Sequence, residues 1–458
     1  MMAAHSADIV VLGGGSGGYA TALRARELGK SVILIEKDKV GGTCLHRGCI
    51  PTKAMLHAGE VADAARDAAL VGINAEYNGV DVGALHAYRD KIVAKKFQGL
   101  QGLLSTRGVT VVSGAGVVSA DRIVTVGEDT YRGDALVIAT GSASRTLPGL
   151  EIGGRVLTSE EALSLPEIPE RVVVLGGGVI GVEFASMWRS LGADVTIVEG
   201  ADHLLPTEDI DVSKGLERAF RKRGIAFSLG TPFSGVAQTS DAVEVTLANG
   251  ATHSADYLLV AVGRAPVTAD LGLTEAGIST ERGFIVANER LATSHPGVWA
   301  VGDVVAGLQL AHRSFQHGIF VAEEIAGLAP VVIPETHIPK VTYSHPEVAS
   351  VGLSVAAAEA EYGAKDVSSY TYNLAGNARS EILGTAGVVK VVRRVGGPVL
   401  GVHLLGDRVG ELISEAQLVV GWDAHPEDIA PYIHAHPTQS EALGEAFLAL
   451  AGKPLHGL

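Results

Sequence analysis

The sequence predicts an α/β protein that contains two dinucleotide-binding motifs of the same design. Two apolar, β-branched segments each lead directly into a G-x-G-x-x-G turn, one at Gly13 and the other at Gly176. Each turn is followed by a helical segment and then by a second apolar segment that ends in a glutamate. The landmarks of the second motif are displaced by 163 positions (176 minus 13) from those of the first. A chance match of spacing, flanks and acid is therefore improbable.

Composition and charge limit the classes of protein to which the chain can belong. Its 458 residues correspond to about three domains, and 47% hydrophobic residues with 58 glycines suit a large α/β core. A net charge of -15 argues against nucleic acid or an anionic membrane as partner, because both attract clustered Lys and Arg. No apolar run reaches the roughly 18 residues of a transmembrane helix. Residues 1–7 lack the features of a signal peptide, so we expect a cytoplasmic protein.

The first motif begins with a buried strand over residues 8–12. Gly13, Gly15 and Gly18 form the turn, which allows the backbone to approach a pyrophosphate at a helix N-terminus. We expect that helix over residues 19–28 and a second strand over 31–35. Glu36 then follows the second strand, where it can accept hydrogen bonds from ribose hydroxyls.

The stretch at residues 41–53, GGTCLHRGCIPTK, contains the only two cysteines of the chain, Cys44 and Cys49. Glycines permit the tight backbone that a disulfide loop needs, and Pro51 suits the first turn of a helix. Cys49 would then lie near a helix N-terminus, which lowers a thiol pKa. Zinc usually takes four ligands, which two cysteines do not supply, so we expect no metal site. A redox-active pair is favoured over a structural disulfide or two ordinary buried thiols.

The second motif indicates which nucleotide it binds. A strand over residues 171–175 precedes Gly176, Gly178 and Gly181, and a helix over 182–191 and a strand over 194–198 lead to Glu199. A carboxylate at that position accepts from a ribose 2′-hydroxyl and repels a 2′-phosphate. Residues 200–204 offer no Arg or Lys to bind such a phosphate, so NAD is favoured over NADP.

The remaining segments of the sequence also predict alternating helices and strands, in agreement with the α/β fold class. Apolar periodicity predicts helices over residues 55–70, 82–106 and 311–328. Strands are expected within 109–126, 135–141 and 226–262, and an apolar segment at 298–301 ends at Asp303, where α/β folds bind ligands. A proline-bounded link at 330–339 leads to a last domain with strands at 388–394 and 400–405 and helices at 409–420 and 440–450.

One polar segment of this last domain, HAHPTQSE, also has catalytic potential. His436 and Glu441 stand five residues apart across a proline turn, so the carboxylate could orient the imidazole for proton transfer. The alternative is an ordinary solvated or core histidine, as most of the 16 histidines must be.

Taken together, these segments resemble those of the flavoprotein disulfide reductases, the class I pyridine nucleotide-disulfide oxidoreductases, and most closely the dihydrolipoamide dehydrogenases among them. The resemblance rests on GGTCLHRGCIPTK, on VIGVEFAS after the second glycine turn, on WAVGD and on HAHPTQSE. It covers essentially the full chain. It implies two Rossmann-like domains, for FAD and NAD, with a C-terminal α+β dimerisation domain.

The resemblance also implies roles for individual residues. Cys44 would exchange with the substrate dithiol and Cys49 would pass electrons to FAD, while His436 would act as acid/base with Glu441 as its orienting partner. Further residues would bind cofactors, with Lys53 and Glu183 forming an ion pair beside the flavin and Asp303 holding its ribityl chain. The expected FAD set is Gly13, Gly15, Gly18, Glu36, Thr43, Lys53, Thr140, Gly141 and Asp303, and the expected NAD set is Gly176, Gly178, Gly181, Glu183, Glu199 and Gly263.

The implied organisation has four parts: an FAD-binding part with the redox pair over residues 1–147, an NAD-binding domain over 148–271, a second FAD part over 272–339 and an interface domain over 340–458. In this family His436 and Glu441 serve the other subunit's site, so a homodimer is expected. The implied reaction is oxidation of dihydrolipoamide by NAD through a Cys44–Cys49 disulfide, with the lipoyl domain of a 2-oxo acid dehydrogenase or glycine cleavage complex as partner.

Two positions depart from the family pattern, and other activities stay open. Ser16 stands where many relatives have proline, and His317 stands where a glutamate is expected.

Mycothiol, glutathione and mercuric reductases share several of these segments. A catalytically silent FAD-binding scaffold or redox sensor is the alternative of a different class, and the joint presence of both cysteines, His436 and Glu441 argues against it.

Overall fold

The structure is a computed structural model that describes residues 3–457. The chain divides into two compact units. Unit 1 comprises residues 1–54, 83–145 and 264–333, and unit 2 comprises residues 55–82, 146–263 and 334–458. The four-part division expected from the sequence is finer than this one and stays a prediction.

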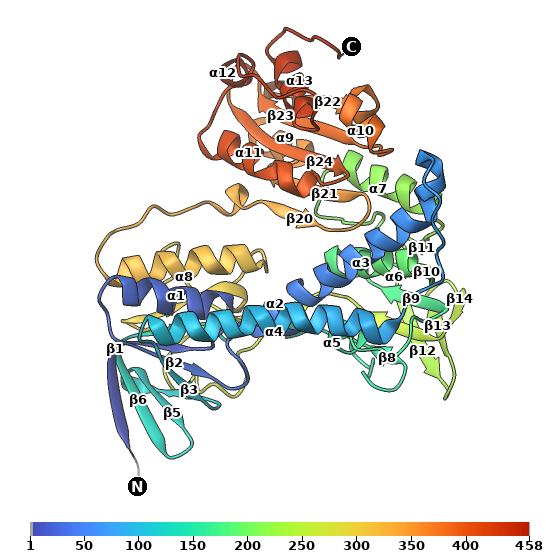
Figure 1. Cartoon of the computed structure of the whole chain (residues 1–458). Helices are drawn as coiled ribbons and strands as arrows, with labels where there is room; N and C mark the ends of the chain where they lie inside the picture. The colour runs from blue at the N-terminus through green and yellow to red at the C-terminus, as the bar shows by residue number, and fades with distance from the viewer. Residues whose placement is uncertain (1–2, 458) are drawn as a thin grey trace. The chain divides into compact units, whose positions relative to one another are not determined.

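A seven-stranded sheet forms the centre of unit 1 (Figure 1). Its middle is parallel, with β1 pairing β2 and β6, and β6 also pairing β19. The strands β4 and β5 add an antiparallel edge beyond β6. The strands are β1 (Ala4–Leu12), β2 (Val32–Glu36), β3 (Thr110–Ser113), β4 (Val117–Ser119), β5 (Ile123–Val126), β6 (Asp129–Ile138) and β19 (Val298–Ala300). Two small antiparallel pairs join β7 (Ser142–Ser144) to β16 (Arg264–Pro266) and β17 (Thr280–Glu281) to β18 (Phe284–Ile285).

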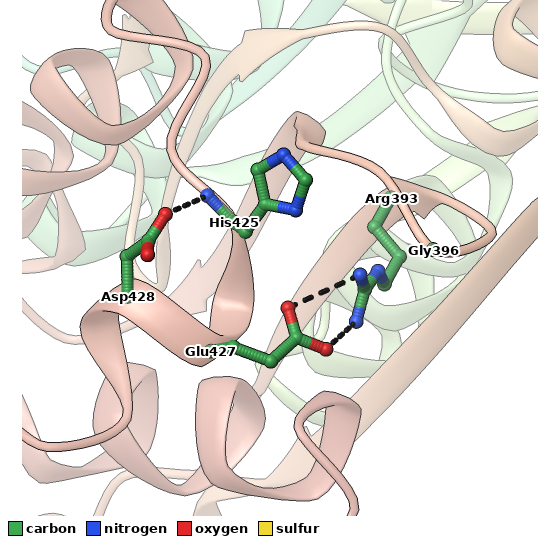
Figure 2. A pocket seen from close by; sticks show the side chains of 5 residues that line it. All are labelled: Arg393, Gly396, His425, Glu427 and Asp428. Atoms are coloured by element: carbon green, nitrogen blue, oxygen red, sulfur yellow. Dashed lines mark hydrogen bonds and ion pairs between the residues drawn. The ribbon is translucent and has the colours of Figure 1, made fainter.

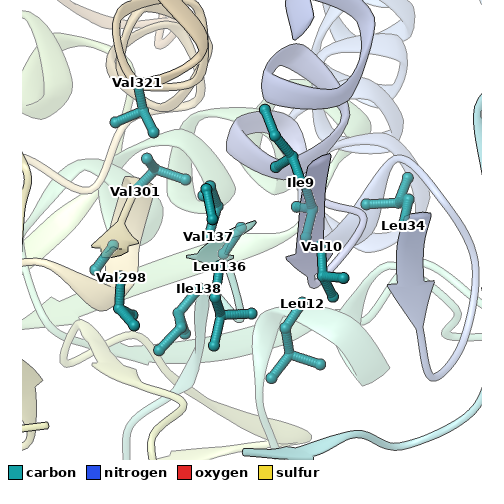
Figure 3. Packing of buried hydrophobic residues seen from close by; sticks show 14 of the residues in the cluster. Ile9, Val10, Leu12, Leu34, Leu136, Val137, Ile138, Val298, Val301 and Val321 are labelled. Atoms are coloured by element: carbon teal, nitrogen blue, oxygen red, sulfur yellow. The ribbon is translucent and has the colours of Figure 1, made fainter. Parts of the chain in front are cut away.

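The core of unit 1 lies around β1, β6 and β19. Figure 3 shows side chains of these strands packed with those of β2 and of helix α8 (Ala311–Ile325). Ile9, Val10, Leu136 and Val137 are fully buried. Continuous apolar runs of this kind are typical of parallel strands that are covered on both faces.

Helices α1 (Ser16–Glu27) and α8 lie side by side in unit 1 (Figure 1). Their backbones approach closely, because a Cβ on Gly318 would lie 2.4 Å from the carbonyl oxygen of Gly17. Arg24 Nη2 donates to Glu323 Oε1 at 2.6 Å and joins the two helices at the surface. The remaining helices of this part are α2 (Gly42–Arg47), the start of α3 (Cys49–Asp67) and α4 (Val82–Thr106).

Unit 2 contains a parallel five-stranded sheet in the order β11-β10-β9-β15-β8. Its strands are β8 (Val156–Leu157), β9 (Arg171–Leu175), β10 (Asp194–Val198), β11 (Ala226–Ser228) and β15 (Tyr257–Val260). An antiparallel sheet of β12 (Phe233–Gln238), β13 (Val243–Leu247) and β14 (Thr252–Ala255) shares a core with it. The helices of this part are α5 (Ser159–Ala162), α6 (Val179–Leu191) and α7 (Ile210–Lys222).

The last part of unit 2 is an antiparallel sheet in the order β20-β21-β24-β23-β22 with helices packed on it. The strands are β20 (Lys340–Thr342), β21 (Glu347–Gly352), β22 (Val367–Asn373), β23 (Val388–Arg394) and β24 (Val399–Gly406). The helices are α9 (Val355–Tyr362), α10 (Ala378–Ile382), α11 (Val409–Gly421), α12 (Pro426–Ile429) and α13 (Glu441–Leu450). Buried Lys390 on β23 contacts Asp209 (2.8 Å) and Asp211 (2.7 Å), which ties the sheet to α7.

The predicted fold class is confirmed, and the element bounds differ mainly where helices begin. The helices after the glycine turns begin at Ser16 and Val179, three residues before the predicted starts. Helix α3 begins at Cys49 and ends at Asp67, instead of spanning 55–70. The first turn of a helix needs no apolar periodicity, so periodicity alone places these starts too late. Across residues 3–457, no helix has both the length and the apolar composition that crossing a membrane requires.

Candidate active site

The first glycine turn joins β1 to α1 and leaves room for a ligand at one of its three glycines. Gly13 has φ +103°, and a Cβ there would lie 2.3 Å from the carbonyl oxygen of Ala139. A Cβ on Gly18 would lie 1.8 Å from the carbonyl oxygen of Gly13. At Gly15 the nearest atom to such a Cβ is 4.0 Å away. Packing within the chain therefore requires the outer two glycines, whereas a Cβ on the middle one would only touch the Cα of Gly42. The absence of a side chain at this position would let a pyrophosphate approach the helix N-terminus.

Glu36 at the end of β2 supports this turn through its carboxylate. Its Oε2 accepts from the backbone N–H of Gly14 at 2.6 Å, and its Oε1 accepts from the N–H of Asp38 at 2.8 Å. A carboxylate has about four lone-pair positions. Two remain for ribose hydroxyls, so the residue fits the role predicted for it.

Asp303 lies after β19 in a small polar cluster of unit 1. Ser142 Oγ donates to Asp303 Oδ2 at 2.6 Å, and Arg264 Nε donates to Ser142 Oγ at 2.7 Å. Thr140 Oγ1 donates to the carbonyl of Val267 at 2.6 Å, and Gly141 next to it has φ +71°. Ser142 and Arg264 were not among the predicted site residues. Each directly follows a predicted glycine, Gly141 or Gly263, and that adjacency was the available signal.

Helix α8 holds the backbone on both sides of Asp303. The N–H of Gly302 donates to Nδ1 of His317 at 3.3 Å, and Arg313 Nη2 donates to the carbonyl of Ala306 at 2.7 Å. Burial, together with nearby Arg313, lowers the pKa of His317 to about 3. The imidazole is therefore neutral and acts as an acceptor.

Cys44 lies on α2 and Cys49 at the first position of α3, and the two cysteines are not joined by a disulfide in this structure. A hydrogen bond with the Cys49 side chain and burial raise the pKa of the Cys44 thiol. Burial and the charges of the two cysteines raise the pKa of Tyr19 on α1 to about 12. This places Tyr19 near the pair, a neighbour that the sequence reasoning did not identify. Thr43 precedes Cys44 on α2 and is half-buried.

The second glycine turn, in unit 2, repeats the first in detail. Gly176 has φ +112°, and a Cβ on Gly181 would lie 1.9 Å from the Gly176 carbonyl oxygen, while a Cβ on Gly178 would meet nothing within 4 Å. Glu199 accepts from the N–H of Gly177 at 2.6 Å and from that of Ala201 at 2.8 Å. The displacement by 163 therefore extends to the hydrogen bonds. Gly263, with φ +103°, follows the end of the neighbouring strand β15.

The predicted Lys53–Glu183 ion pair involves both units. Lys53 lies on α3, and its charge acts to lower the pKa of Cys44 against the larger raising effects. Glu183 is buried on α6 and accepts from the backbone N–H of Tyr343 at 2.9 Å. The proposed pairing beside a flavin stays a prediction.

His436 and Glu441 are brought together at the start of α13 in unit 2. Nδ1 of His436 lies 2.8 Å from Glu441 Oε1, and Thr438 donates its backbone N–H to Oε2 at 2.7 Å. Burial opposes ionisation, but the hydrogen bonds from Thr438 and His436 prevail and lower the pKa of Glu441. An ionised carboxylate only accepts, so the proton of the imidazole is on Nδ1. The His436 side chain is 73% exposed, so its Nε2 is free to accept a proton from outside this chain.

A surface hollow of about 400 Å³ lies elsewhere in the last part of unit 2. Figure 2 shows its lining residues, with Arg393 paired to Glu427 at 2.7 Å. None of the predicted site residues lines it. Within residues 3–457, no group of three or more His, Cys, Asp or Glu side chains is arranged to hold a metal ion.

Residues 7–318 match the pyridine nucleotide-disulphide oxidoreductase family, and residues 338–447 match its dimerisation domain. The chain is 39% identical to a dihydrolipoyl dehydrogenase of Bacillus subtilis, covering 98% of this chain and 99% of that protein. It is 38% identical to dihydrolipoyl dehydrogenase 3 of Pseudomonas putida, with 98% of each covered. A solved structure of LpdA from Mycobacterium tuberculosis superposes with a TM-score of 0.90 at 26% identity, covering 97% of this chain and 99% of that one.

Proposed function

The chain belongs to the pyridine nucleotide-disulphide oxidoreductase family, and we infer that it catalyses the FAD-dependent oxidation of dihydrolipoamide to lipoamide with reduction of NAD⁺ to NADH. This inference rests on the similarity to dihydrolipoyl dehydrogenases of two organisms, which extends over 98% of this chain at 38–39% identity. The alternatives of the same family, reduction of mycothiol or glutathione disulfide or of mercuric ion, receive less support.

FAD and NAD are the cofactors, and both glycine turns fit them. A Cβ on Gly178 would meet nothing within 4 Å, and a Cβ on Gly15 would only touch the Cα of Gly42, at 4.0 Å. The carboxylates of Glu36 and Glu199 keep lone pairs that could accept from ribose hydroxyls. Residues 200–204 carry no cation that could bind a 2′-phosphate, which favours NAD at the second turn. Asp303, held by Ser142, is our candidate for holding the ribityl chain of FAD. When bound, FAD supplies the two-electron carrier between the thiols and NAD⁺.

We assign the dithiol chemistry to the cysteine pair in its oxidised form. One substrate thiolate attacks Sγ of Cys44, the Cys44–Cys49 bond breaks, and Cys49 leaves as a thiolate. The second substrate sulfur then attacks the mixed disulfide, which closes the lipoamide ring and releases Cys44. Two electrons thereby pass from the substrate to the cysteine pair. The proton of the attacking thiol goes to Nε2 of His436, because the thiolate is the nucleophile.

The protein is a homodimer, since residues 338–447 form the dimerisation domain of the family. We propose that His436 and Glu441 of one subunit serve the cysteine pair of the other, and the exposure of His436 in the single chain supports this. We further propose that the substrate is carried on the lipoyl domain of a 2-oxo acid dehydrogenase or glycine cleavage complex. A cytoplasmic location stays a prediction of the sequence.

The test is steady-state reduction of NAD⁺ by dihydrolipoamide with the purified dimer. NADP⁺ replaces NAD⁺ in a parallel series, and NADH-driven reduction of glutathione and mycothiol disulfides is measured beside it. Fast turnover with dihydrolipoamide and NAD⁺ alone is the expected result. A yellow protein that ignores dihydrolipoamide and reduces another disulfide would refute the substrate assignment and leave the family intact.

A further inference from the structure

His434 stands two positions before His436 and bridges two helices of the last part of unit 2. Its Nε2 lies 2.8 Å from Oε1 of Glu415, which belongs to α11. Its other ring nitrogen faces α13, because a Cβ added to Gly444 would lie 2.6 Å from Nδ1. The His434 side chain is 14% exposed, so these contacts are largely shielded from water. The imidazole is therefore held between two elements of its own chain.

Gly444 on α13 makes room for this imidazole. After proline, glycine is the least favourable residue in a helix interior. The three nearest atoms to a Cβ at Gly444 all belong to the ring of His434, at 2.6, 3.0 and 3.3 Å. Any side chain at this position would push the ring away from the helix. The helix therefore carries a glycine at the point where the ring of His434 lies against it.

The contact with Gly444 brings the imidazole near Glu441. Gly444 lies three positions after Glu441, and residues three apart on a helix are neighbours on its surface. The hydrogen bond with Glu415 raises the pKa of His434 above its ordinary value of 6.5, against burial, and the charge of Glu441 acts in the same direction. Burial opposes the ionisation of Glu441, but hydrogen bonds and the charges of His434 and His436 lower its pKa. The two groups therefore favour each other's charged form.

The titratable groups around this position come from three elements. Glu415 on α11 and Glu441 on α13 are the carboxylates that face His434. Tyr372 on β22 also faces Glu441, and burial, together with nearby carboxylates, raises the pKa of this phenol above its ordinary value of 10. The phenol is therefore neutral where the enzyme works. Below pH 6.5 His434 is a cation that a carboxylate on each helix stabilises.

We propose that His434 is a positioning residue of the dithiol reaction, which keeps Glu441 in place as the ionised hydrogen-bond acceptor of His436. The proposal rests on the proposed function, because His436 is taken to be the base that receives the substrate proton. An ionised Glu441 holds the imidazole proton on Nδ1 and leaves Nε2 to receive the proton of the thiol. Without the neighbouring cation the His436–Glu441 pair is easier to protonate, so it loses its basic form at a higher pH.

The test measures the pH dependence of NAD⁺ reduction by dihydrolipoamide with the full-length dimer. His434→Gln keeps an N–H donor for Glu415 and removes the charge. His456→Gln is a matched control, because Nδ1 of His456 lies 2.8 Å from Glu445, another carboxylate of α13. In His434→Gln the acidic limb of kcat/KM should move about half a pH unit upward, which is about a threefold loss below its midpoint. The limb of His456→Gln, and NADH-driven dye reduction by both variants, should match the parent.

A second variant moves the imidazole without removing a charge. Gly444→Ala puts a Cβ where the ring of His434 lies, so the ring has to shift away from α13. This variant should lose activity with dihydrolipoamide below the same midpoint, by about the same factor, and should keep its flavin absorbance and its dye reduction. Parental pH profiles of both Gly444→Ala and His434→Gln would overturn the proposal.

A double variant shows whether His434 acts through Glu441. If it does, the effects of the two changes are not additive. His434→Gln/Glu441→Gln should then be no slower with dihydrolipoamide than Glu441→Gln alone. Additive losses would overturn the proposal, because His434 would then act independently of Glu441. A parent that does not oxidise dihydrolipoamide would refute the proposed function, and this proposal with it.

Discussion

Replacement of Glu441 by glutamine should impair the dithiol half of the reaction selectively. In the parent, Glu441 accepts two hydrogen bonds, one from His436 Nδ1 and one from the N–H of Thr438. A glutamine side chain has one oxygen and one NH₂ group, so it can accept only one of the two. The half-buried backbone N–H of Thr438 would keep the oxygen. The NH₂ group would then face Nδ1 of His436, which could pair with it only as an acceptor.

The magnitude follows from these contacts. A hydrogen bond to a charged group contributes about 1.5–3 kcal/mol. The lower end applies here because His436 is 73% exposed and Glu441 25% exposed. About 1.4 kcal/mol corresponds to a tenfold change in rate. The change of tautomer acts in the same direction, because a proton on Nε2 prevents that atom from accepting the substrate proton. We therefore expect kcat/KM for dihydrolipoamide to fall by at least about tenfold.

The assay measures two reactions of each variant, NAD⁺ reduction by dihydrolipoamide and NADH-driven reduction of a dye. Only the first needs the imidazole as a base, so the second should stay within about twofold of the parent. Glu445→Gln is a matched control on the same helix, because Glu445 accepts from the N–H of His456 at 3.0 Å and lies 2.8 Å from its Nδ1. The proposed role of Glu441 would be refuted by equal slowing of both reactions or by equal effects of the two variants.

Three further predictions address the cysteines, the second glycine turn and a buried ion pair. Cys44→Ser or Cys49→Ser should abolish dithiol oxidation while the purified protein keeps its flavin absorbance, and robust lipoamide turnover by either variant would contradict the electron path. Gly178→Val places a side chain in open space, so the thermal midpoint should stay at the parental value. The KM for NAD⁺ should rise about tenfold, which corresponds to about 1.4 kcal/mol. An unchanged KM would show that this glycine does not belong to the nucleotide site. Lys390→Met leaves Asp209 buried without its cation and should lower the free energy of unfolding at pH 7 by about 3–5 kcal/mol in urea titrations. Burial opposes the ionisation of Asp209, but the hydrogen bond from Lys390 outweighs this effect and the pKa of Asp209 is lowered. The resulting stabilisation of the folded state is complete above the ordinary value of 3.8 and declines as the pH falls below it. A loss under about 1 kcal/mol would show that the pair contributes little.

Much of the fold was predictable because its signals are local. The two glycine turns, the strands that enter them and the acids that follow lie within 30 consecutive residues each, and their geometry follows from steric limits on a short backbone. The predicted bounds of α4, β9 and β10 match the structure. Helix starts were placed late after the glycine turns, because glycine and serine in a first turn carry no apolar signal.

The surroundings of the candidate site were less predictable, because they depend on residues that are distant in sequence. Ser142 donates to Asp303 across 161 positions, and Arg264 donates to Ser142 across 122. His317 was recognised as a departure from the family pattern, but its neutrality follows from burial and from Arg313 one turn earlier on α8. The position of Tyr19 near the two cysteines, where burial and their charges raise its pKa, likewise results from tertiary packing.

The sequence by itself determined the two dinucleotide-binding motifs, the cysteine pair and the His436–Glu441 spacing, since each is a pattern of residue types at short separation. The tertiary structure decided which glycines of each turn are required by packing, which nitrogen of His436 carries the proton, and which face of α4 stays uncovered within the chain. Those properties depend on atoms that long-range strand pairing and helix packing bring together. A short window of sequence carries no information about such atoms, because the energy of each contact depends on both partners and on the burial around them.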